Sequence, residues 1–416
     1  MSFTYKNDTL YCENVSVPRI IKEQGTPCYI YSYAALVHQF NSIRKAFAPV
    51  DPMICFAMKA NDNSAVVKTL VNQGAGCDIV SGGELAKALK CQADPQTIVF
   101  ASVGKTDDEI IAAIKAKILF FNVESQAELE RINLLASQQG VKPGIALRIN
   151  PDVAAATHDR ITTGTLEKKF GIDLATARDI LLNQDRYPAL DFNGLHMHIG
   201  SQITTVEPYV RAMKRVLAFL DDLTRADVYL RYFDLGGGFG IDYDGETSCP
   251  IEGFATPLIP LLEETGLNII LEPGRFLCGN AGIFITKTLY LKDNGVKKFL
   301  IVDAGMNDLP RPSLYGAYHA ITPVKKNHGP TDTFDVVGPI CESGDFFAKE
   351  RVLPVVRQGD LLAIHSAGAY CYVMASNYNV RGRSPEIMVK GNKFAVIKKR
   401  ETLKDITRGE SIPDFI

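Results

Sequence analysis

Between residues 53 and 271, short apolar runs alternate with longer segments that carry an amphipathic helical pattern. Runs that are hydrophobic on both alternations are typical of strands buried on both faces. The pattern predicts eight strands, at Met53–Met58, Cys77–Val80, Ile98–Ala101, Leu119–Val123, Ile145–Ile149, Gly194–Ile199, Tyr232–Leu235 and Ile269–Leu271. It predicts the helices between them at Ser64–Gln73, Gly83–Cys91, Asp107–Ala116, Gln126–Gln138, Leu174–Leu182, Pro208–Leu223 and Phe254–Glu264. This alternation fits an α/β fold of the (β/α)₈ barrel type better than an open doubly wound sheet, whose usual strand count is lower.

The chain on either side of this region has a different pattern. A helix is predicted from Ser32, a suitable N-cap, to about Phe47. After Gly279 the runs are short, β-rich and punctuated by Gly and Pro, at Ile283–Leu291, Lys298–Val302, Thr333–Val337, Leu361–Ile364, Glu386–Val389 and Phe394–Lys398. Leu10–Glu13 and Pro27–Tyr31 are also strand-like. We therefore expect a barrel at residues 31–278 and a C-terminal all-β domain at 279–416 to which residues 1–30 contribute.

Composition narrows the function. Lys and Arg total 45 against 47 Asp and Glu, so no basic footprint for nucleic acid is present. No apolar run approaches the roughly 20 residues that span a bilayer, and the N-terminus lacks the pattern of a secretory signal. The nine cysteines are scattered, none closer together than Cys77 and Cys91, which argues against a disulfide framework and close-spaced zinc motifs. We expect a cytoplasmic enzyme that acts on a small molecule.

The first predicted barrel strand delivers a single lysine, Lys59, at its end. An ammonium at the end of a buried strand is costly unless it is paired, reacted or at a cavity mouth. A lone lysine more often reaches solvent, whereas a lysine in a low-dielectric pocket can form a Schiff base. The other strand ends decide between these interpretations.

In a (β/α)₈ barrel the reactive residues come from the carboxyl ends of the strands. Polar residues and glycines gather at those positions, namely Lys59, Asp78, Ser81, Arg148, His198, Ser201, Gly236, Gly237, Gly238, Glu272 and Arg275. Agreement among several independent strands favours the functional interpretation of Lys59.

The segment 234–240, Asp-Leu-Gly-Gly-Gly-Phe-Gly, follows an apolar strand. Successive glycines let backbone N–H groups converge on an anion, although tight turns use glycine as well. Because Arg275 follows the next strand, we expect a phosphate site in the loops after the last two strands, where barrels often have one.

Glu272 lies at the end of the last predicted strand, in the sequence Glu-Pro-Gly-Arg. A structural ion pair is one interpretation; beside a Schiff-base lysine, a carboxylate that keeps a pyridine nitrogen protonated is the other. His196 and His198 point to the same side of their strand. Since no further ligands at metal-site spacing accompany them, we expect no metal. We expect instead that the imidazole ring of His198 stacks on a flat cofactor.

These residues resemble the barrel motifs of the fold-type III pyridoxal-phosphate (PLP) decarboxylases. The motifs are Met58-Lys-Ala-Asn61, Asp78-Ile-Val-Ser-Gly-Gly-Glu84, His198-Ile-Gly-Ser-Gln202, Leu235-Gly-Gly-Gly238 and Glu272-Pro-Gly-Arg275. Further motifs are similar to those of the diaminopimelate decarboxylase family, at Arg311–Gly316, Cys341–Asp345, Gly368–Tyr370 and Ser376–Asn379. The resemblance runs through nearly the whole chain, and it departs from the family pattern at Met58 and Pro310, where an aliphatic residue is more usual.

The resemblance implies an alanine-racemase-like barrel with a β domain, and a homodimer with shared active sites. It implies PLP-dependent decarboxylation of meso-2,6-diaminopimelate to L-lysine and CO₂, the last step of lysine biosynthesis by that pathway. Lys59 would bind the cofactor covalently, Glu272 would face its ring nitrogen, His198 would stack on the ring, and Cys341 would donate a proton. The other cofactor-binding positions implied are Asp78, Ser201, Gly236, Gly237, Gly238, Pro273, Gly274, Arg275 and Tyr370. The substrate-binding positions implied are Arg148, Arg275, Arg311, Tyr315, Glu342 and Tyr370.

The residue types agree with those roles. A substrate with an amino-acid group at each end needs an arginine and hydroxyls for its distal carboxylate and a carboxylate for its distal ammonium, and Arg311, Tyr315 and Glu342 supply them. Cys341 has a simpler alternative as a small buried hydrophobe.

Other functions remain open from the sequence. Sibling decarboxylases act on ornithine, arginine, carboxynorspermidine or D-amino acids, but Arg311 favours a substrate with a distal carboxylate. A racemase of this fold places an arginine against the ring nitrogen, and a PLP-binding regulatory protein usually lacks the β domain or the proton donor. The polar segment Asp152–Phe170 is either a lid or a surface loop.

Overall fold

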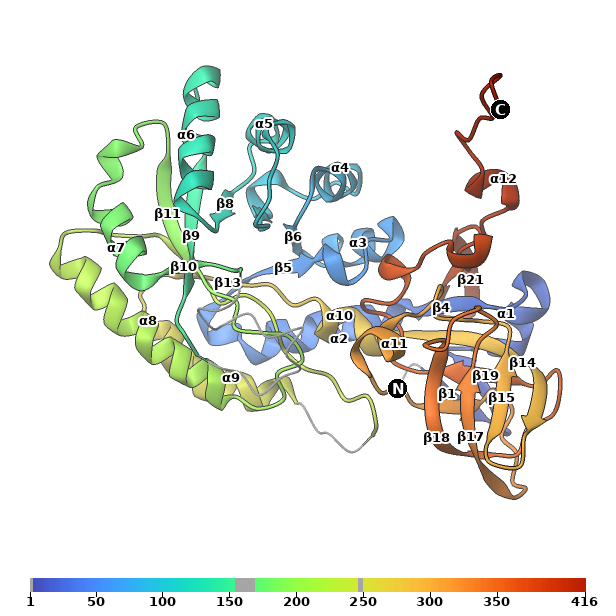
Figure 1. Ribbon diagram of the computed structural model, residues 1–416. Helices are drawn as coiled ribbons and strands as arrows, with labels where there is room; N and C mark the ends of the chain where they lie inside the picture. The colour runs from blue at the N-terminus through green and yellow to red at the C-terminus, as the bar shows by residue number, and fades with distance from the viewer. Residues whose placement is uncertain (1–2, 154–168, 246–249) are drawn as a thin grey trace. The chain divides into compact units, whose positions relative to one another are not determined.

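The computed structural model describes residues 3–153, 169–245 and 250–416, which fall into two compact units (Figure 1). The barrel unit comprises Val37–Asp242 and Thr247–Leu277. The sheet unit comprises Met1–Leu36, Tyr243–Glu246 and Cys278–Ile416, so it extends beyond the expected boundary at residue 30. The segment predicted as a lid or loop, Asp152–Phe170, lies mostly outside the described residues.

Eight parallel strands close on themselves in the barrel unit. In order around the barrel they are β5 (Met53–Ala57), β6 (Gly76–Ile79), β7 (Ile98–Phe100), β8 (Phe120–Val123), β9 (Gly144–Asn150), β11 (Asp191–His196), β12 (Tyr232–Asp234) and β13 (Asn268–Leu271). The circle closes because β13 pairs with β5, with Ile270 beside Met53. A short strand, β10 (Ile172–Asp173), adds to β9. All eight strands predicted from the sequence, and the barrel they form, are confirmed.

Helices alternate with these strands and lie outside them in Figure 1. They are α2 (Tyr33–Ala46), α3 (Ser64–Val71), α4 (Gly82–Lys90), α5 (Asp107–Ala116), α6 (Gln126–Gln139), α7 (Leu174–Leu182), α8 (Glu207–Arg225) and α9 (Ile251–Glu264), with the short α10 (Arg275–Cys278) after β13. Side chains fix where several begin: the Ser81 hydroxyl accepts a hydrogen bond from the Glu84 N–H, and Thr106 forms a capping box with Glu109. Ser81 lies two residues beyond the end of β6, so α4 begins close to that strand end.

A seven-stranded path forms the main sheet of the sheet unit. Its order is β18 (Phe346–Pro354), β17 (Thr331–Val337), β15 (Lys298–Val302), β14 (Gly282–Asp293), β4 (Cys28–Ser32), β20 (Glu386–Lys390) and β21 (Lys393–Lys398). β19 (Leu361–Ile364) pairs with β14 and with β16 (Ile321–Pro323). The N-terminal strand β4 therefore lies between two C-terminal strands, antiparallel to β14 and parallel to β20.

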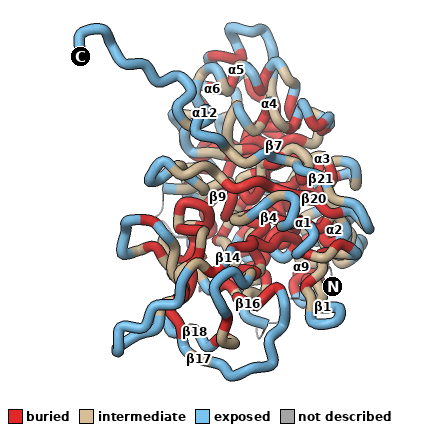
Figure 2. The backbone as a smooth tube through the Cα atoms, turned by 90° about the vertical axis from the view of Figure 1, so that its right-hand side faces the viewer, coloured by how far each residue is buried: buried red, intermediate tan, exposed pale blue. Residues whose placement is uncertain are grey.

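The remaining elements of this unit are short. β1 (Phe3–Lys6), β2 (Thr9–Cys12) and β3 (Val15–Ser16) form a small sheet, α1 (Val17–Gln24) follows it, and α11 (Arg311–Tyr315) and α12 (Leu403–Ile406) lie in the C-terminal part. Figure 2 shows the chain after α12 exposed along its length.

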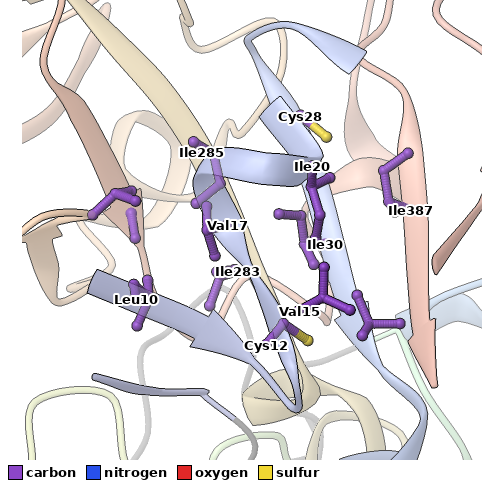
Figure 3. Packing of buried hydrophobic residues seen from close by; sticks show 13 residues of the cluster. Leu10, Cys12, Val15, Val17, Ile20, Cys28, Ile30, Ile283, Ile285 and Ile387 are labelled. Carbon is purple, nitrogen blue, oxygen red and sulfur yellow. The ribbon is translucent and has the colours of Figure 1, made fainter. Parts of the chain in front are cut away.

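Apolar side chains from both ends of the chain form the core of the sheet unit (Figure 3). Leu10 and Ile30 come from the N-terminal strands, and they cluster with Ile283, Ile285 and Ile387, all at most 1% exposed. Burying such a side chain contributes roughly 1.5–3 kcal/mol relative to leaving it exposed. The N-terminal segment is thus held by hydrophobic contacts as well as by strand pairing.

The sequence pattern missed β18, β16 and α1. In β18 the charged run Lys349-Glu350-Arg351 hides the strand, although its pairing with β17 supplies the burial that a sequence scan cannot see. α1 begins at Val17 with a proline at its second position, where a missing N–H costs nothing.

Candidate active site

Lys59 lies one residue beyond Met58, in a short 3₁₀ turn that follows β5. Its Nζ donates a hydrogen bond to Asp78 Oδ2 at 2.7 Å, and Asp78 is the third residue of β6. The Lys59 side chain is 35% exposed whereas that of Asp78 is fully buried. The lysine is thus both paired and reachable, the combination that a residue reacting with a bound molecule requires.

Glu272 follows β13 and is held at both carboxylate oxygens. Asn122 Nδ2 donates to Glu272 Oε1 at 3.2 Å, and His196 Nε2 lies 3.1 Å from Glu272 Oε2. His196 comes from β11 and Asn122 from β8, so three strands fix the orientation of one buried carboxylate.

The three buried carboxyl groups at the strand ends, Glu272, Asp234 and Asp78, differ in pKa. Burial and neighbouring charges explain the difference. Burial favours a raised pKa for Glu272, but its contact with His196 and the charge of Lys59 lower that pKa below its usual value. Burial, with the neighbouring charge of Glu272, raises the pKa of Asp234 well above its usual value. The same two causes raise the pKa of Asp78 to about 7 despite the opposing charge of Lys59. Glu272 is therefore the carboxyl that stays ionised.

His196, the last residue of β11, and His198, two residues further on, have different surroundings. His196 is 1% exposed and burial lowers its pKa, so it is a neutral donor to Glu272. Burial, together with the charges of Lys59 and Arg148, holds the pKa of His198 well below its usual value. His196, Asp234 and Glu272 place ligand-type atoms within 4.8 Å of one another, a grouping that the spacing of the sequence did not reveal.

The glycine run after β12 is packed too tightly for any side chain. A Cβ on Gly237 would lie 2.1 Å from the Glu272 carbonyl oxygen, and one on Gly236 would lie 2.3 Å from that of Met197. Gly236 and Gly238 also have positive φ angles of 74° and 105°. Glycine is therefore required for this path of the backbone, which brings the Gly237 N–H to 3.3 Å from His198 Nδ1.

Arg275 and Ser201, both among the predicted cofactor-binding positions, contact each other. Arg275 Nη2 donates to Ser201 Oγ at 3.0 Å, and Arg275 is 6% exposed. A Cβ on Gly274 would lie 3.0 Å from the Cβ atoms of Ala57 and Ala60, and the Pro273 carbonyl accepts from the Ala57 N–H. The Glu-Pro-Gly-Arg segment is thereby tied to the turn that carries Lys59.

Arg148, expected to contact substrate, has a protein partner. Its Nη1 donates to Glu124 Oε1 at 2.7 Å, and both side chains are almost fully buried. The sequence analysis missed Glu124, and it missed Asn122 as a partner of Glu272. Asn122 lies in β8 and Glu124 follows it, at a strand end that was predicted but was not examined for polar residues.

The other predicted residues lie in the sheet unit. Arg311 begins α11 and is 6% exposed, whereas Tyr315, at the end of that helix, is half-buried. Cys341 and Glu342 are exposed; the Cys341 N–H donates to Asn379 Oδ1 at 2.9 Å. Tyr370 has a φ of 56°, in the left-handed region. Contrary to the simpler expectation for a free cysteine, Cys341 is not a buried core residue.

The barrel residues fit a pyridoxal phosphate group on this arrangement. Lys59 offers a primary amine, Glu272 an ionised carboxylate, and Arg275 with the glycine run a site for a phosphate. Buried polar atoms remain without hydrogen-bond partners among the described residues, including Asp78 Oδ1 and His196 Nδ1. Since buried polar groups are normally satisfied, these atoms indicate that the barrel end is built around a further polar group.

Comparison with known proteins places the chain. The family profile described as "Pyridoxal-dependent decarboxylase, pyridoxal binding domain" matches residues 33–279. A diaminopimelate decarboxylase from Pseudomonas fluorescens is 43% identical over 412 residues, covering 99% of each chain. The chain belongs to the diaminopimelate decarboxylase family. Another member, from Aquifex aeolicus, is 46% identical over 95% of this chain and 94% of its own.

Solved structures of the family have the same fold. Diaminopimelate decarboxylase from Helicobacter pylori, complexed with L-lysine, superposes with a TM-score of 0.90 at 40% identity, covering 94% of this chain and 98% of its own. The (β/α)₈ barrel with its β-rich second unit is therefore the fold of the family. Among the residues described, no helix combines the length and apolar character needed to cross a membrane.

Proposed function

We propose that this protein is a PLP-dependent carboxy-lyase that converts meso-2,6-diaminopimelate to L-lysine and CO₂, the last step of lysine biosynthesis by the diaminopimelate pathway. Its relatives of that name match it over nearly their full length. One observation carries the proposal: the chain has residues suited to the cofactor and a residue suited to the substrate. The former are Lys59 and Glu272 at the barrel's strand ends, and the latter is the buried Arg311 of the sheet unit.

The barrel residues are assigned to the cofactor. Lys59 would hold it covalently through Nζ, Glu272 would pair with its ring nitrogen and His198 would pack against its ring. The phosphate is assigned to Ser201, Gly236, Gly237, Gly238 and Arg275, and Asp78, Pro273, Gly274 and Tyr370 complete the set. When bound, PLP supplies the electron sink for the pair of electrons left when CO₂ departs.

The ionised state of Glu272 matters to that role. A carboxylate opposite a pyridine nitrogen stabilises the protonated ring. Asn122 and His196 keep the carboxylate oriented, and Asp234, whose pKa is raised, avoids adding a second charge beside it. Asp78 holds the Lys59 ammonium in place through its 2.7 Å hydrogen bond.

The remaining roles concern the substrate and a proton. Arg311 and Tyr315 are assigned to the distal carboxylate and Glu342 to the distal ammonium, with Arg148, Arg275 and Tyr370 as further contacts. The carbon that loses CO₂ needs one proton in exchange, and Cys341 Sγ is assigned to donate it.

The assembly in the proposal is a homodimer with shared active sites. Its support is the exposure of Cys341 and Glu342, since groups that serve chemistry at a protein surface need a second surface to exclude water. A cytoplasmic location is part of the same proposal and agrees with the free thiols of the eight described cysteines.

The test is CO₂ release by the purified, PLP-loaded protein with a panel of amino acids. We expect turnover of meso-2,6-diaminopimelate and at least 100-fold lower kcat/KM for ornithine, arginine and lysine. Lys59→Ala should abolish turnover, and borohydride reduction should no longer link the cofactor to the chain. Lys87→Ala is the matched control, since Lys87 pairs with Asp62 at 2.5 Å outside the proposed site. Preference for ornithine, or full turnover by Lys59→Ala, would refute the proposal.

A further inference from the structure

The guanidinium of Arg311 is buried in the sheet unit. Arg311 is 6% exposed, and no carboxylate among the described residues forms an ion pair with it. A buried charge is normally paired, because leaving it unpaired costs several kcal/mol. The arrangement therefore fits a site whose counter-charge arrives with a ligand.

His319 contacts this guanidinium, and its contacts determine which nitrogen of the His319 ring carries the proton. Arg311 Nη1 lies 2.8 Å from His319 Nε2, and an arginine can only donate. His319 Nε2 must then be the acceptor, so the ring proton is on Nδ1. His319 Nδ1 is 2.8 Å from the His365 carbonyl oxygen, which can only accept. One neutral tautomer satisfies both contacts, and His319 is fully buried.

An aromatic ring restrains the same guanidinium from another direction. Arg311 Cζ lies 4.7 Å from the centre of the Tyr243 ring, and that ring meets the His319 ring edge to face at 5.3 Å. The hydrogen bond fixes one Nη and the ring fixes the plane, so the remaining N–H donors point in a defined direction.

The backbone around His319 is itself anchored. The His365 N–H donates to the Ala320 carbonyl at 2.8 Å, and Arg351 Nη1 donates to the His319 carbonyl at 2.9 Å. His365 Nε2 lies 2.8 Å from Thr322 Oγ1, which also contacts the Tyr5 hydroxyl. Contacts within the sheet unit thus hold the position of His319.

We propose that His319 is a positioning residue that orients Arg311 for the distal carboxylate of the substrate and so sets the preference for substrates with a carboxylate at both ends. This inference rests on the proposed function, in which Arg311 binds that carboxylate. The neutral acceptor on His319 occupies one donor of the guanidinium and leaves a fork of N–H groups for bidentate binding of a carboxylate.

Product binding provides a test that does not depend on turnover. Decarboxylation at one end of diaminopimelate leaves the carboxylate of the other end on L-lysine, whereas cadaverine lacks it. The affinities of the PLP-loaded enzyme for both compounds are measured by calorimetry. Asparagine at position 319 can still reach the His365 carbonyl but is too short to accept from Arg311, and glutamine can reach the position of Nε2.

We expect His319→Asn to weaken L-lysine binding about tenfold, the loss of one charge-assisted hydrogen bond, while cadaverine affinity changes less than about twofold. His319→Gln should recover L-lysine affinity to within about threefold of wild type. In turnover, His319→Asn should raise KM for diaminopimelate with kcat changed much less. His328→Gln, at an exposed histidine of the same unit, is the control.

The outcomes separate the two proposals. If wild type neither binds L-lysine nor decarboxylates diaminopimelate, the proposed function fails. If it does both and Arg311→Gln lowers L-lysine affinity but His319→Asn does not, only the role of His319 is overturned. Equal losses of L-lysine and cadaverine in His319→Asn also overturn it, since they indicate a structural role. If His319→Asn does not fold, failure of His319→Gln to bind L-lysine selectively overturns it.

Discussion

The barrel unit and the sheet unit carry their candidate residues in opposite ways. In the barrel, Asp78 and Glu272 are buried and bonded to neighbours on other strands, so their positions follow from one closed fold. In the sheet unit, Cys341 and Glu342 are exposed on the loop after β17, although Arg311 is buried and braced. The barrel unit therefore holds its candidate residues in buried contacts, whereas the sheet unit exposes two of its candidates.

The difference indicates a division of labour. In the proposed function the barrel residues hold a cofactor, which requires one geometry through every turnover, and their burial in the barrel favours this. A proton donor must meet a reacting carbon away from bulk water. An exposed thiol meets that condition only when another surface covers it, which leads to the proposed shared site.

The largest expected effect breaks the comparison directly. Lys59→Ala and Cys341→Ala should each be nearly inactive as homodimers. If each active site combines the barrel of one chain with Cys341 of the other, mixing the two variants should restore activity. Random exchange gives half mixed dimers with one complete site of two, hence roughly a quarter of the wild-type CO₂ release.

The control for this experiment is a double variant that carries both substitutions on one chain. When the double variant is mixed with wild type, neither shared site of a mixed dimer would be complete. The CO₂ release should then come only from the wild-type homodimers that remain. Lack of recovery in the Lys59→Ala and Cys341→Ala mixture, under conditions where subunit exchange is shown by mass, would mean that each site lies within one chain.

The same comparison explains what the sequence could predict. Barrel strands are apolar on both faces, so the eight strands of the closed barrel could be predicted from pattern alone, and a strand end is a definite place to search for polar residues. That rule found Lys59, Ser201 and Arg275, of which the last two form a hydrogen bond. It could not find the bonds of Asn122 and His196 to Glu272, because contacts across a barrel depend on register, which a single sequence does not reveal.

The sheet unit was harder to predict. Its strand β18 carries charges because one face meets solvent, and the placement of β4 between β14 and β20 joins residues hundreds of positions apart. The contact of Arg311 with the Tyr243 ring likewise joins residues far apart in the sequence. Only family motifs pointed to Arg311, Tyr315 and Cys341 before the structure was considered.

A smaller effect tests whether the barrel half is as rigid as its packing indicates. Gly237→Ala introduces a Cβ 2.1 Å from the Glu272 carbonyl oxygen, so the backbone must move. A displacement of about 1 Å at a reacting centre can cost about 10²-fold, and we expect that order of loss in kcat/KM with at least tenfold weaker PLP binding by equilibrium dialysis.

Gly104→Ala is the matched control for that change. Gly104 has open space where its Cβ would be placed, and it lies in the same unit. Its kinetics and PLP affinity should equal those of wild type. If Gly237→Ala behaves like Gly104→Ala, the glycine run is not a rigid cradle and the contrast between the two units is weaker than proposed.

The smallest effect concerns a buried acid in the sheet unit with no proposed chemistry. Asp308 accepts hydrogen bonds from the Ser384 hydroxyl at 2.6 Å and from the Gly305 N–H at 3.2 Å, yet burial raises its pKa to about 6. The folded state holds the proton of Asp308 more tightly than the unfolded state, so proton binding by Asp308 stabilises the fold. This contribution is fully present below about pH 4 and is lost as the pH rises through about 6. The difference amounts to about 3 kcal/mol.

Asp308→Asn should remove that pH-dependent loss, so its thermal midpoint should fall less between pH 4.5 and 7 than that of wild type. Asp332→Asn, at an exposed acid paired with Lys298, should leave the wild-type dependence in this range almost unchanged. Decarboxylation by Asp308→Asn at pH 7 should stay within about threefold of wild type, whereas Asp78→Asn in the barrel should impair PLP binding. If Asp308→Asn loses PLP binding as Asp78→Asn does, burial of acids serves the site in both units and the division between them does not hold.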